Sequence, residues 1–451
     1  MISFDQDHLE TQKLTLKTNN ISIESSGIVR NFLNPFLDIK IKTGDIIIED
    51  IAKLFPDVLK NAGVTIKGLL TLTANYKGLL QKPLDADAQV ISQLKNVFVS
   101  SDKLPSPIAN LSGEINYQKN LLTLKNVGGF FQDKRYNITA EVKNFSQPAV
   151  KIDILSDDIK ATAQITVAGQ NIQIATLKAN YLNSSCDLKG DIFLKNNAEP
   201  TIDMRGILNV NIADLRNFLP ANIKEQLYQL KPLGTLSIDG TLKGAPTNWT
   251  NWHLSFKATS ARFSVMNYAI ENIKIDFTQK NQAIDTATLN ATIYGGNFNM
   301  ALVSDLSQNT LPIKTSMTLE NLDLTLLQKD AKTPIKNLAG LMSAALQVSG
   351  PILDQNKIKG AANLSIVDGN LGQIIPEFRN TIFNAASADF TIQDGKFKTE
   401  NATIKSNMLD LKAKGWIDFA KNINFDIAPS SNQPAGDESG RMKLSLPALL
   451  E

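Results

Sequence analysis

The sequence has few of the residues from which catalytic, redox and metal sites are usually built. It contains one cysteine, Cys186, and two histidines, His8 and His253, which lie far apart in the chain. A single cysteine excludes an internal disulfide framework, and this supply of ligands argues against a His/Cys metal site. The G-x-S-x-G, P-loop and G-x-G-x-x-G motifs are also absent from the sequence. We therefore expect no enzymatic activity, no metal and no cofactor.

Long apolar runs and blocks of charge are missing too. The chain has 451 residues, of which 43% are hydrophobic and 20% charged, with a net charge of +2. No run of about 18 apolar residues predicts a transmembrane helix. No basic block predicts nucleic-acid binding, and the N-terminus lacks the pattern of a signal peptide. It starts instead in a strand-like pattern, so we expect the chain to begin inside a repeat array, either as a truncated repeat or as a piece of a longer protein.

What the sequence does have is alternation of apolar and polar residues. Over residues 340–425 the period is two, as at Phe390 and Ile392, and this is typical of a strand with one dry and one wet face. The pairs Asp368-Gly369 and Asp394-Gly395 supply the positive φ that a tight hairpin turn needs. The same pattern recurs through the chain. We predict a mainly β fold: a long, twisted and curled antiparallel sheet of repeated hairpins with a few short α-helices.

Repetition is visible in the spacing of glycines. Three stretches hold an alternating strand between two glycines ten positions apart: 68–78, 234–244 and 340–350. A strand, a turn and a short helix precede each of them. Helices are expected near 51–62, 214–230 and 322–338, with a weaker turn near 372–384, and we expect them to cover the edge or end of a sheet.

These repeats define the expected organisation of the chain. The first part is a strand-turn-helix unit that ends at residue 67. Three repeats follow it, and the first of them contains inserted strands. The polar stretch from Pro429 predicts a flexible tail. The expected segments are 1–67, 68–233, 234–339, 340–428 and 429–451.

Two architectures fit one-sided patterning over so many strands. An apolar sheet face must be covered, and an open sheet rarely exceeds ~10 strands without curling or splitting. A second sheet could provide the cover, which would make the protein a plain β-sandwich. Alternatively the sheet could curl into a trough whose apolar face takes lipid chains. Patterning alone favours the sandwich.

The polar residues that stand out have structural interpretations. Asp85 and Asp87, and the adjacent Asp157 and Asp158, could act as acid and base or hold a cation, but solvated turns account for them better. His253 has no partner ligand near it in sequence. A site for glycoside hydrolysis would need two facing carboxylates, and no such pair is evident.

Aromatic and glycine pairs are interpreted in the same way. Trp249 and Trp252 are expected to cap the end of the apolar face rather than to contact a membrane interface, where tryptophan is also favoured. The pairs 128–129 and 295–296 are expected to be glycine bulges or bends that curve the sheet, rather than ligand-binding loops.

The order of segments around Tyr294 carries a family resemblance. The sequence YGGNFNM at 294–300 is followed by PIKTSMTLENLDLTLL, by NLAGLMSAALQVSG and by GAANLSIVDGNL. This order resembles the C-terminal region of the AsmA family of bacterial envelope proteins, clearly over 234–427 and more loosely over 14–233. Members of that family usually carry an N-terminal inner-membrane helix, which this chain does not have.

The resemblance implies a periplasmic protein of a Gram-negative-type bacterium, anchored in the inner membrane in its full-length form. It further implies a bridge-like β-groove that moves phospholipid between the inner and outer membranes and supports outer-membrane integrity. With this resemblance the curled trough is favoured over the β-sandwich. The alternatives are a chaperone or assembly factor for outer-membrane proteins, which would bind them at strand edges, and a purely structural periplasmic scaffold. The expected partners are phospholipid acyl chains and proteins that act in outer-membrane protein assembly or in inner-membrane anchoring. Nucleic acid is not an expected partner.

A lipid-binding groove needs no special residue, because many similar apolar sites let a chain slide. The candidates are therefore a set of apolar side chains on alternating positions of the last two repeats. They are Phe256, Phe277, Phe298, Met300, Leu302, Phe390, Ile392, Leu409, Leu411 and Ile417.

Overall fold

A computed structural model of the chain describes most of its residues. The described ranges are 2–17, 22–52, 63–82, 85–101, 104–195, 198–215, 225, 230–266, 268–330, 338–371, 382–407, 410–420, 422–430 and 442–446. The chain divides into two compact units, Met1–Ala198 and Glu199–Glu451, and each is described by itself. The division falls inside the segment 68–233 that the sequence predicts as one repeat.

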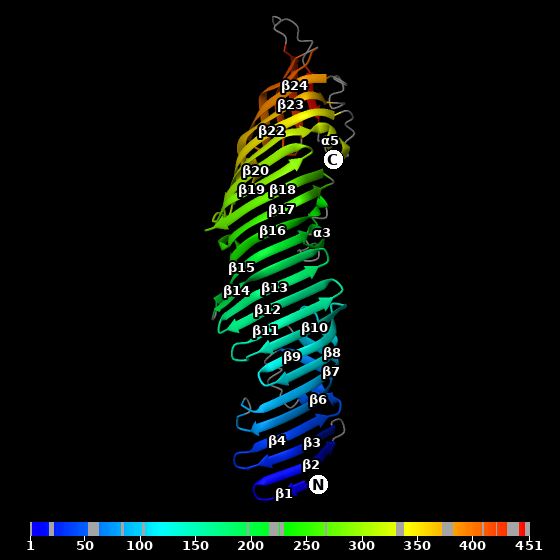
Figure 1. The fold of residues 1–451 in the computed structure, drawn as a ribbon. Helices are drawn as coiled ribbons and strands as arrows, with labels where there is room; N and C mark the ends of the chain where they lie inside the picture. The colour runs from blue at the N-terminus through cyan, green and yellow to red at the C-terminus, as the bar shows by residue number, and fades with distance from the viewer. Residues whose placement is uncertain are drawn as a thin grey trace. The chain divides into compact units, whose positions relative to one another are not determined.

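The first unit is an antiparallel sheet in which strands follow one another in sequence order (Figure 1). Strand β4 pairs with β6, and the two-residue strand β5 also pairs with β6. Helix α1 (Ile48–Ala52) follows β5 and contacts β6. The strands are β1 (Ile2–Phe4), β2 (His8–Lys17), β3 (Ser22–Arg30), β4 (Phe36–Thr43), β5 (Ile46–Ile47), β6 (Val64–Leu79), β7 (Asp87–Ser101), β8 (Ile108–Gln118), β9 (Leu121–Phe131), β10 (Lys134–Lys143), β11 (Ala149–Ser156), β12 (Ile159–Ala168), β13 (Asn171–Tyr181) and β14 (Ser184–Lys195).

The second unit repeats this arrangement. Each strand from β16 to β27 pairs antiparallel with the strands before and after it. Helices α3 (Ile212–Leu215) and α5 (Leu324–Asp330) contact β16 and β22, and Figure 1 shows them beside the ends of the strands. The strands are β15 (Ala198–Asn211), β16 (Leu233–Gly244), β17 (His253–Val265), β18 (Tyr268–Lys280), β19 (Ala283–Ile293), β20 (Gly296–Asp305), β21 (Pro312–Asp323), β22 (Leu338–Pro351), β23 (Lys359–Leu371), β24 (Ile382–Gln393), β25 (Lys396–Lys405), β26 (Leu411–Asp418), β27 (Ile423–Pro429) and β28 (Met442–Leu446); short 3-10 turns lie at Trp249–Asn251 and Gln355–Lys357.

The predicted fold class is confirmed: the protein is mainly β, built from consecutive antiparallel hairpins with short helices. The expected helices begin near the predicted places, but most of 51–62, 214–230 and 331–338 and all of 372–381 lie outside the described residues. Residues 382–384, part of the expected turn, belong to strand β24. Within the predicted flexible tail, residues 442–446 form strand β28, which pairs with β27.

The three glycine frames occupy equivalent places in the fold. Gly68, Gly234 and Gly340 lie near the starts of β6, β16 and β22, each at a shift of register against the following strand. All three have positive φ, at 131°, 142° and 115°. A Cβ would approach Val97 Cα to 2.8 Å at Gly68 and the Phe263 ring to 2.7 Å at Gly234. Glycine is therefore required where a β-bulge meets a close neighbouring backbone, and the repeat is structural.

Of the glycine pairs at 368–369, 394–395 and 295–296, the second behaves as predicted and the other two do not. Asp394-Gly395 forms the predicted two-residue hairpin turn, with φ of 53° and 69° between β24 and β25. Asp368-Gly369 does not: it lies inside β23, where Asp368 has a φ of 50° and forms a bulge. Conversely Gly295 forms a hairpin turn with Tyr294 rather than a bend in the sheet. Positive φ is common to bulges and turns, so the residue types alone do not distinguish them.

Tyr294 ties this turn to helix α5. Its hydroxyl donates a hydrogen bond to Asp330 Oδ2 at 2.8 Å and accepts one from the Ala269 backbone N–H at 3.2 Å. Burial, and after it the bond to the Asp330 carboxylate, raises the pKa of Tyr294 to about 12. The tyrosine thus joins β18, the β19–β20 turn and the end of α5 through one oxygen atom.

We expect Tyr294→Phe to lower the free energy of unfolding of the second unit by about 1 kcal/mol, because two hydrogen bonds are lost. The raised pKa adds a pH dependence: this contribution is present below pH 10 and disappears as the pH rises through about 12. Urea denaturation followed by tryptophan fluorescence measures it, since Trp249, Trp252 and Trp416 all lie in this unit. If the difference in the free energy of unfolding between wild type and variant is the same from pH 8 to pH 12, the role assigned to the hydroxyl is contradicted.

Candidate functional site

The candidate site is the apolar face of the sheet, which the strand register assembles from side chains far apart in sequence. In the second unit, directly opposed residues form what we call the central row, which crosses from β15 to β24. Its members are Leu208, Ile238, Ala258, Ile275, Leu289, Met300, Met317, Leu346, Ala362 and Phe390. Every one of them is apolar.

A second row lies beside the central row on the same face. Its members lie two residues from the central row on β17 to β24, and the row continues onto β25, β26 and β27. They are Phe256, Phe277, Ala287, Leu302, Thr315, Val348, Gly360, Ile392, Phe397, Ile417 and Ile423. Phe256 and Phe277 are stacked, with ring centroids 5.0 Å apart. Neither row contains a charged residue, so the face offers nothing that would bind an ionic group.

The first unit has a corresponding row of its own. It crosses from β4 to β13 through Ile41, Ala74, Val90, Tyr117, Leu122, Val142, Val150, Ile165 and Ile174. These side chains are all partly exposed. The two units therefore share one design, in which consecutive hairpins extend a band of aliphatic side chains by one residue per strand.

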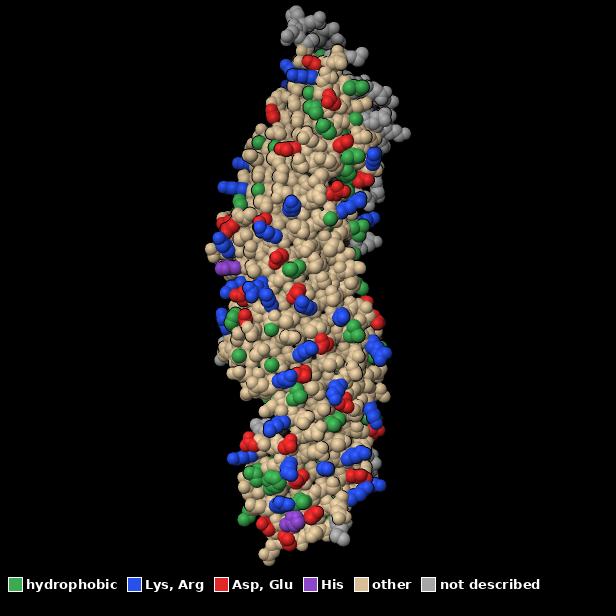
Figure 2. Space-filling model, viewed as in Figure 1, with side chains coloured by type: hydrophobic (Ala, Val, Ile, Leu, Met, Phe, Trp, Pro, Cys, Tyr) green, Lys and Arg blue, Asp and Glu red, His purple; other side chains and the backbone are tan. Residues whose placement is uncertain are grey.

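The opposite face of each sheet is polar, as alternation requires. Opposed residues on it form ion pairs across strands, such as Asp38–Lys77 at 3.0 Å and Asp203–Lys243 at 2.9 Å. Figure 2 shows charged side chains of both signs spread over the face turned toward the viewer, with apolar side chains mostly single or in small groups. Exposed pairs of this kind contribute little to stability, but they keep this face in water.

The burial of the apolar-face residues varies along each strand. On β18 the apolar-face residues run from Ile273, which is 6% exposed, through the partly exposed Ile275 and Phe277 to Gln279 at 5%. A β-sandwich buries the middle of its inward face most deeply, against the second sheet. On β18 the buried Ile273 lies near the middle of the strand and the buried Gln279 near its end, with two partly exposed residues between them.

Strands β24 and β21 also have partly exposed residues between two buried ones, whereas on β17 the buried Ala258 and Ser260 lie in the middle of the strand. On β24, Phe383 and Ile392 near the two ends are each 1% exposed, whereas Ala388 and Phe390 between them are partly exposed. On β21 the corresponding buried ends are Thr315 and Leu322, and Met317 is partly exposed. The central row lies between these buried positions; Ala258 is 2% exposed, and the other members of the row are partly exposed. The described strands pair in a single sheet, so the two-sheet sandwich that patterning alone favoured is not what they form.

The exposed area agrees with this thin packing. The chain of 49.4 kDa exposes 28462 Å². Two separate compact domains of half that mass would together expose only ~20,000 Å².

The structure places the candidate residues as follows. Phe256, Phe277, Leu302, Ile392 and Ile417 belong to the second row, and Met300 and Phe390 to the central row. Phe298 lies on the same face, two residues from Met300. Leu411 is on this face but only 7% exposed, and Ile392 is buried, so both are covered by protein. Leu409 lies outside the described residues.

The polar residues considered from the sequence are not assembled into a site. Asp157 and Asp158 occupy the turn between β11 and β12, where Asp158 pairs with Lys134. His253 is exposed at the start of β17. In the part of the chain that the structure describes, no three His, Cys, Asp or Glu residues are grouped so that they could hold a metal ion. Within the same residues, no helix has both the length and the hydropathy to cross a membrane.

The two tryptophans differ in exposure. Trp252 packs over Gly244, and its indole N–H donates to the Ala245 carbonyl at 2.7 Å, so it caps the end of β16. Trp249 is 49% exposed, while its backbone carbonyl accepts a hydrogen bond from Gln279 Nε2 at 2.7 Å. The turn that carries both therefore closes one border of the apolar face.

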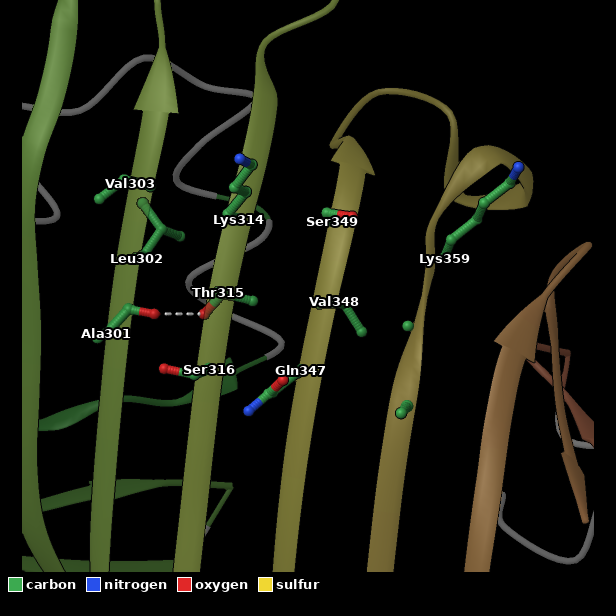
Figure 3. A pocket seen from close by; sticks show the side chains of 12 residues that line it. Ala301, Leu302, Val303, Lys314, Thr315, Ser316, Gln347, Val348, Ser349 and Lys359 are labelled. Atoms are coloured by element: carbon green, nitrogen blue, oxygen red, sulfur yellow. Dashed lines mark hydrogen bonds between the residues drawn. The ribbon is translucent and has the colours of Figure 1, made fainter.

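Sequence reasoning did not identify the shallow depressions of the polar face. One of about 620 Å³ lies over β20 to β23, with Lys314 and Lys359 on either side of Ser349 (Figure 3). Thr315 Oγ1 donates to the Ala301 carbonyl at 2.9 Å beneath it. Its floor consists of small residues such as Ala301 and Ala361. The sequence signal for such a depression is a set of small residues on the polar face of neighbouring strands. The sequence does not show which of them are opposed, because that depends on the strand register.

Comparison with known proteins adds no relative to this description: no family model matches the chain, and no curated protein matches it.

Proposed function

We propose that this protein is a non-enzymatic lipid-binding scaffold whose apolar face holds the acyl chains of phospholipids. The observation that supports the proposal is the central row, a band of ten opposed apolar residues of which all but Ala258 are partly exposed. Water against such a face is unfavourable, so a ligand of matching polarity is expected there. A protein client is a less suitable match, because a β-strand would bring its own backbone polar groups onto a face without partners for them.

The chemistry of the rows suits acyl chains in particular. Burying a CH₂ group is worth ~0.8 kcal/mol, so one long chain gains on the order of 10 kcal/mol of gross transfer energy. The successive members of the central row differ little in polarity, from Ile275 to Leu289 to Met300. A chain that shifts by one strand therefore exchanges one aliphatic environment for another. Such a surface permits movement along the sheet as well as binding.

The wider setting of the proposal rests on the resemblance to the AsmA family. On that basis the scaffold is periplasmic, belongs to a longer protein anchored in the inner membrane, and supplies phospholipid to the outer membrane. The fold supports this setting in a general way, because a long antiparallel sheet of consecutive hairpins is what a β-groove requires. A chaperone for outer-membrane proteins and a structural scaffold are the competing functions.

Co-purified lipid tests the proposal directly. The chain is expressed in a Gram-negative host, purified in detergent-free buffer, extracted with organic solvent and analysed by mass spectrometry. We expect phospholipid at one or more molecules per chain. An extract without phospholipid, from protein that is folded by circular dichroism, would contradict the proposed function.

A further inference from the structure

A second depression on the polar face of the first unit has a chemistry different from that of the rest of the surface. It has a volume of about 810 Å³ and lies over β8 to β11, on the side of the sheet opposite the apolar row. Ser112, Gly128 and Asn137 are opposed on three consecutive strands, and Leu155 faces Asn137 on the fourth. No side chain rises from the centre, because the central residue is Gly128.

The backbone of the depression is shaped by bulges. Asn110 and Asn126 have φ of 52° and 48°, inside β8 and β9, and the register shifts on both sides of Ser112. Each bulge sets one asparagine out of the alternating pattern and lowers the sheet beside it. Two asparagines and a glycine floor therefore lie next to each other in a region where regular pleating would place a row of larger side chains.

Two apolar side chains form the walls. Phe130 is 40% exposed and is opposed by Ala109 on one side and Arg135 on the other; Leu155 is 55% exposed. An aromatic ring that is this exposed on a polar face leaves one π-surface available to a ligand. The small Ala109 beside it leaves that surface uncrowded.

Three polar side chains of the depression are free to bind a ligand. The side chains of Asn126, Asn137 and Arg135 form no hydrogen bond or ion pair with any residue within the described ranges. Each presents a planar group with two or more hydrogen-bonding atoms in a fixed geometry. A guanidinium without a carboxylate partner is able to bind two neighbouring oxygen atoms of a ligand at once.

We propose that this depression is a binding site for an oligosaccharide. A sugar ring has an apolar C–H face, which stacks on an aromatic ring, and vicinal hydroxyls, which match the paired atoms of an amide or a guanidinium. Phe130 provides the first contact, and Asn126, Asn137 and Arg135 provide the second. The glycine floor admits the ring edge to the level of the backbone.

Other ligand classes match the site less well. An extended peptide binds a sheet by adding to an unpaired edge, but β9 and β10 are each paired on both sides. A nucleic acid needs several cations along its phosphates, and Arg135 is the only cationic side chain that lines the depression. An acyl chain would leave the amides and the guanidinium without partners. The site is independent of the lipid-binding face, since it lies on the opposite side of the sheet.

Saturation-transfer difference NMR tests the proposal with cellotetraose, chitotetraose and tetragalacturonate as probes. We expect transfer from the protein to the ring protons of at least one of them. Gly128→Leu should weaken binding at least tenfold, because the leucine side chain fills the floor of the depression. The backbone should not be disturbed, since a Cβ at this position meets only the Tyr136 carbonyl oxygen, at 3.6 Å. Phe130→Ala and Arg135→Met should each reduce the affinity about tenfold.

Phe193→Ala is the matched control, because Phe193 is also 40% exposed and lies on strand β14 of the same unit. It should bind as the wild type does, and all variants should retain their circular dichroism spectrum and their bound phospholipid. The absence of transfer to all three probes would overturn the proposal. So would equal binding by wild type and Gly128→Leu, or a loss in Phe193→Ala as large as that in Phe130→Ala.

Discussion

Met317→Glu is expected to remove most of the lipid that the protein carries. Met317 lies in the central row, between Met300 and Leu346, and is partly exposed. A glutamate there remains solvated until an acyl chain covers it. The acyl chain must then either desolvate the carboxylate or leave that stretch of the central row uncovered. We expect at least a tenfold fall in co-purified phospholipid, measured by mass spectrometry, and a similar fall in the rate of lipid transfer between vesicles.

Ser316→Glu provides the matched control, since Ser316 is the adjacent residue of β21 and is exposed on the polar face. It introduces the same charge one position away, on the other side of the sheet. This variant should keep its lipid and its transfer rate. Equal lipid content in the two variants would mean that the side of the sheet does not matter, and the assignment of the apolar face would be wrong.

Phe383→Ala is expected to cost about 3–5 kcal/mol of the free energy of unfolding of the second unit, the usual range for a fully buried phenylalanine. Phe383 is 1% exposed and packs against Gly369, whose position has no room for a Cβ beside the ring. Its truncation leaves a cavity at a buried position near one end of β24. Urea denaturation followed by tryptophan fluorescence gives the value.

Phe298→Ala removes the same side chain from the open part of the same face. Phe298 is partly exposed on β20, so the variant should cost only about 1–2 kcal/mol. The ratio of the two losses reports whether the middle of the face is covered. Similar losses of 3–5 kcal/mol for both would indicate a sandwich-like core and would argue against an open groove.

Alternation was sufficient to predict the strands and the side on which most candidate residues lie. Phe256, Phe277 and Leu302 share a face because residues two positions apart point to the same side of a strand, and strands that pair in sequence order keep that side in common. The glycine frames were also readable, because a positive φ next to a close backbone excludes other residues. These features are local, and local chemistry determines them.

Burial within the apolar face could not be predicted in the same way. Ile392 and Ile417 have the same alternating context in the sequence, but Ile392 is 1% exposed and Ile417 is partly exposed. The difference depends on which loop or strand end covers each position. A charge at Ile392 or Leu411 would for this reason test folding rather than lipid binding.

The bulges were the second feature beyond the reach of the sequence pattern. Asn96, Asn126, Asn272 and Asn321 each have a φ near 50° inside a strand, and register shifts adjoin them. Asparagine tolerates this conformation but is equally common in turns and on polar faces. Only the pairing shows which asparagines are bulges. The polar-face depressions depend on those bulges and were therefore not found.

Site-specific photo-crosslinking tests the central claim most directly. A benzophenone amino acid is placed at Met300, in the central row, or at Ala301, exposed on the other face of the same strand. After irradiation in living cells the account predicts a phospholipid adduct at position 300 and none at position 301. A protein adduct at position 300 in place of lipid, or no difference between the two positions, would contradict it.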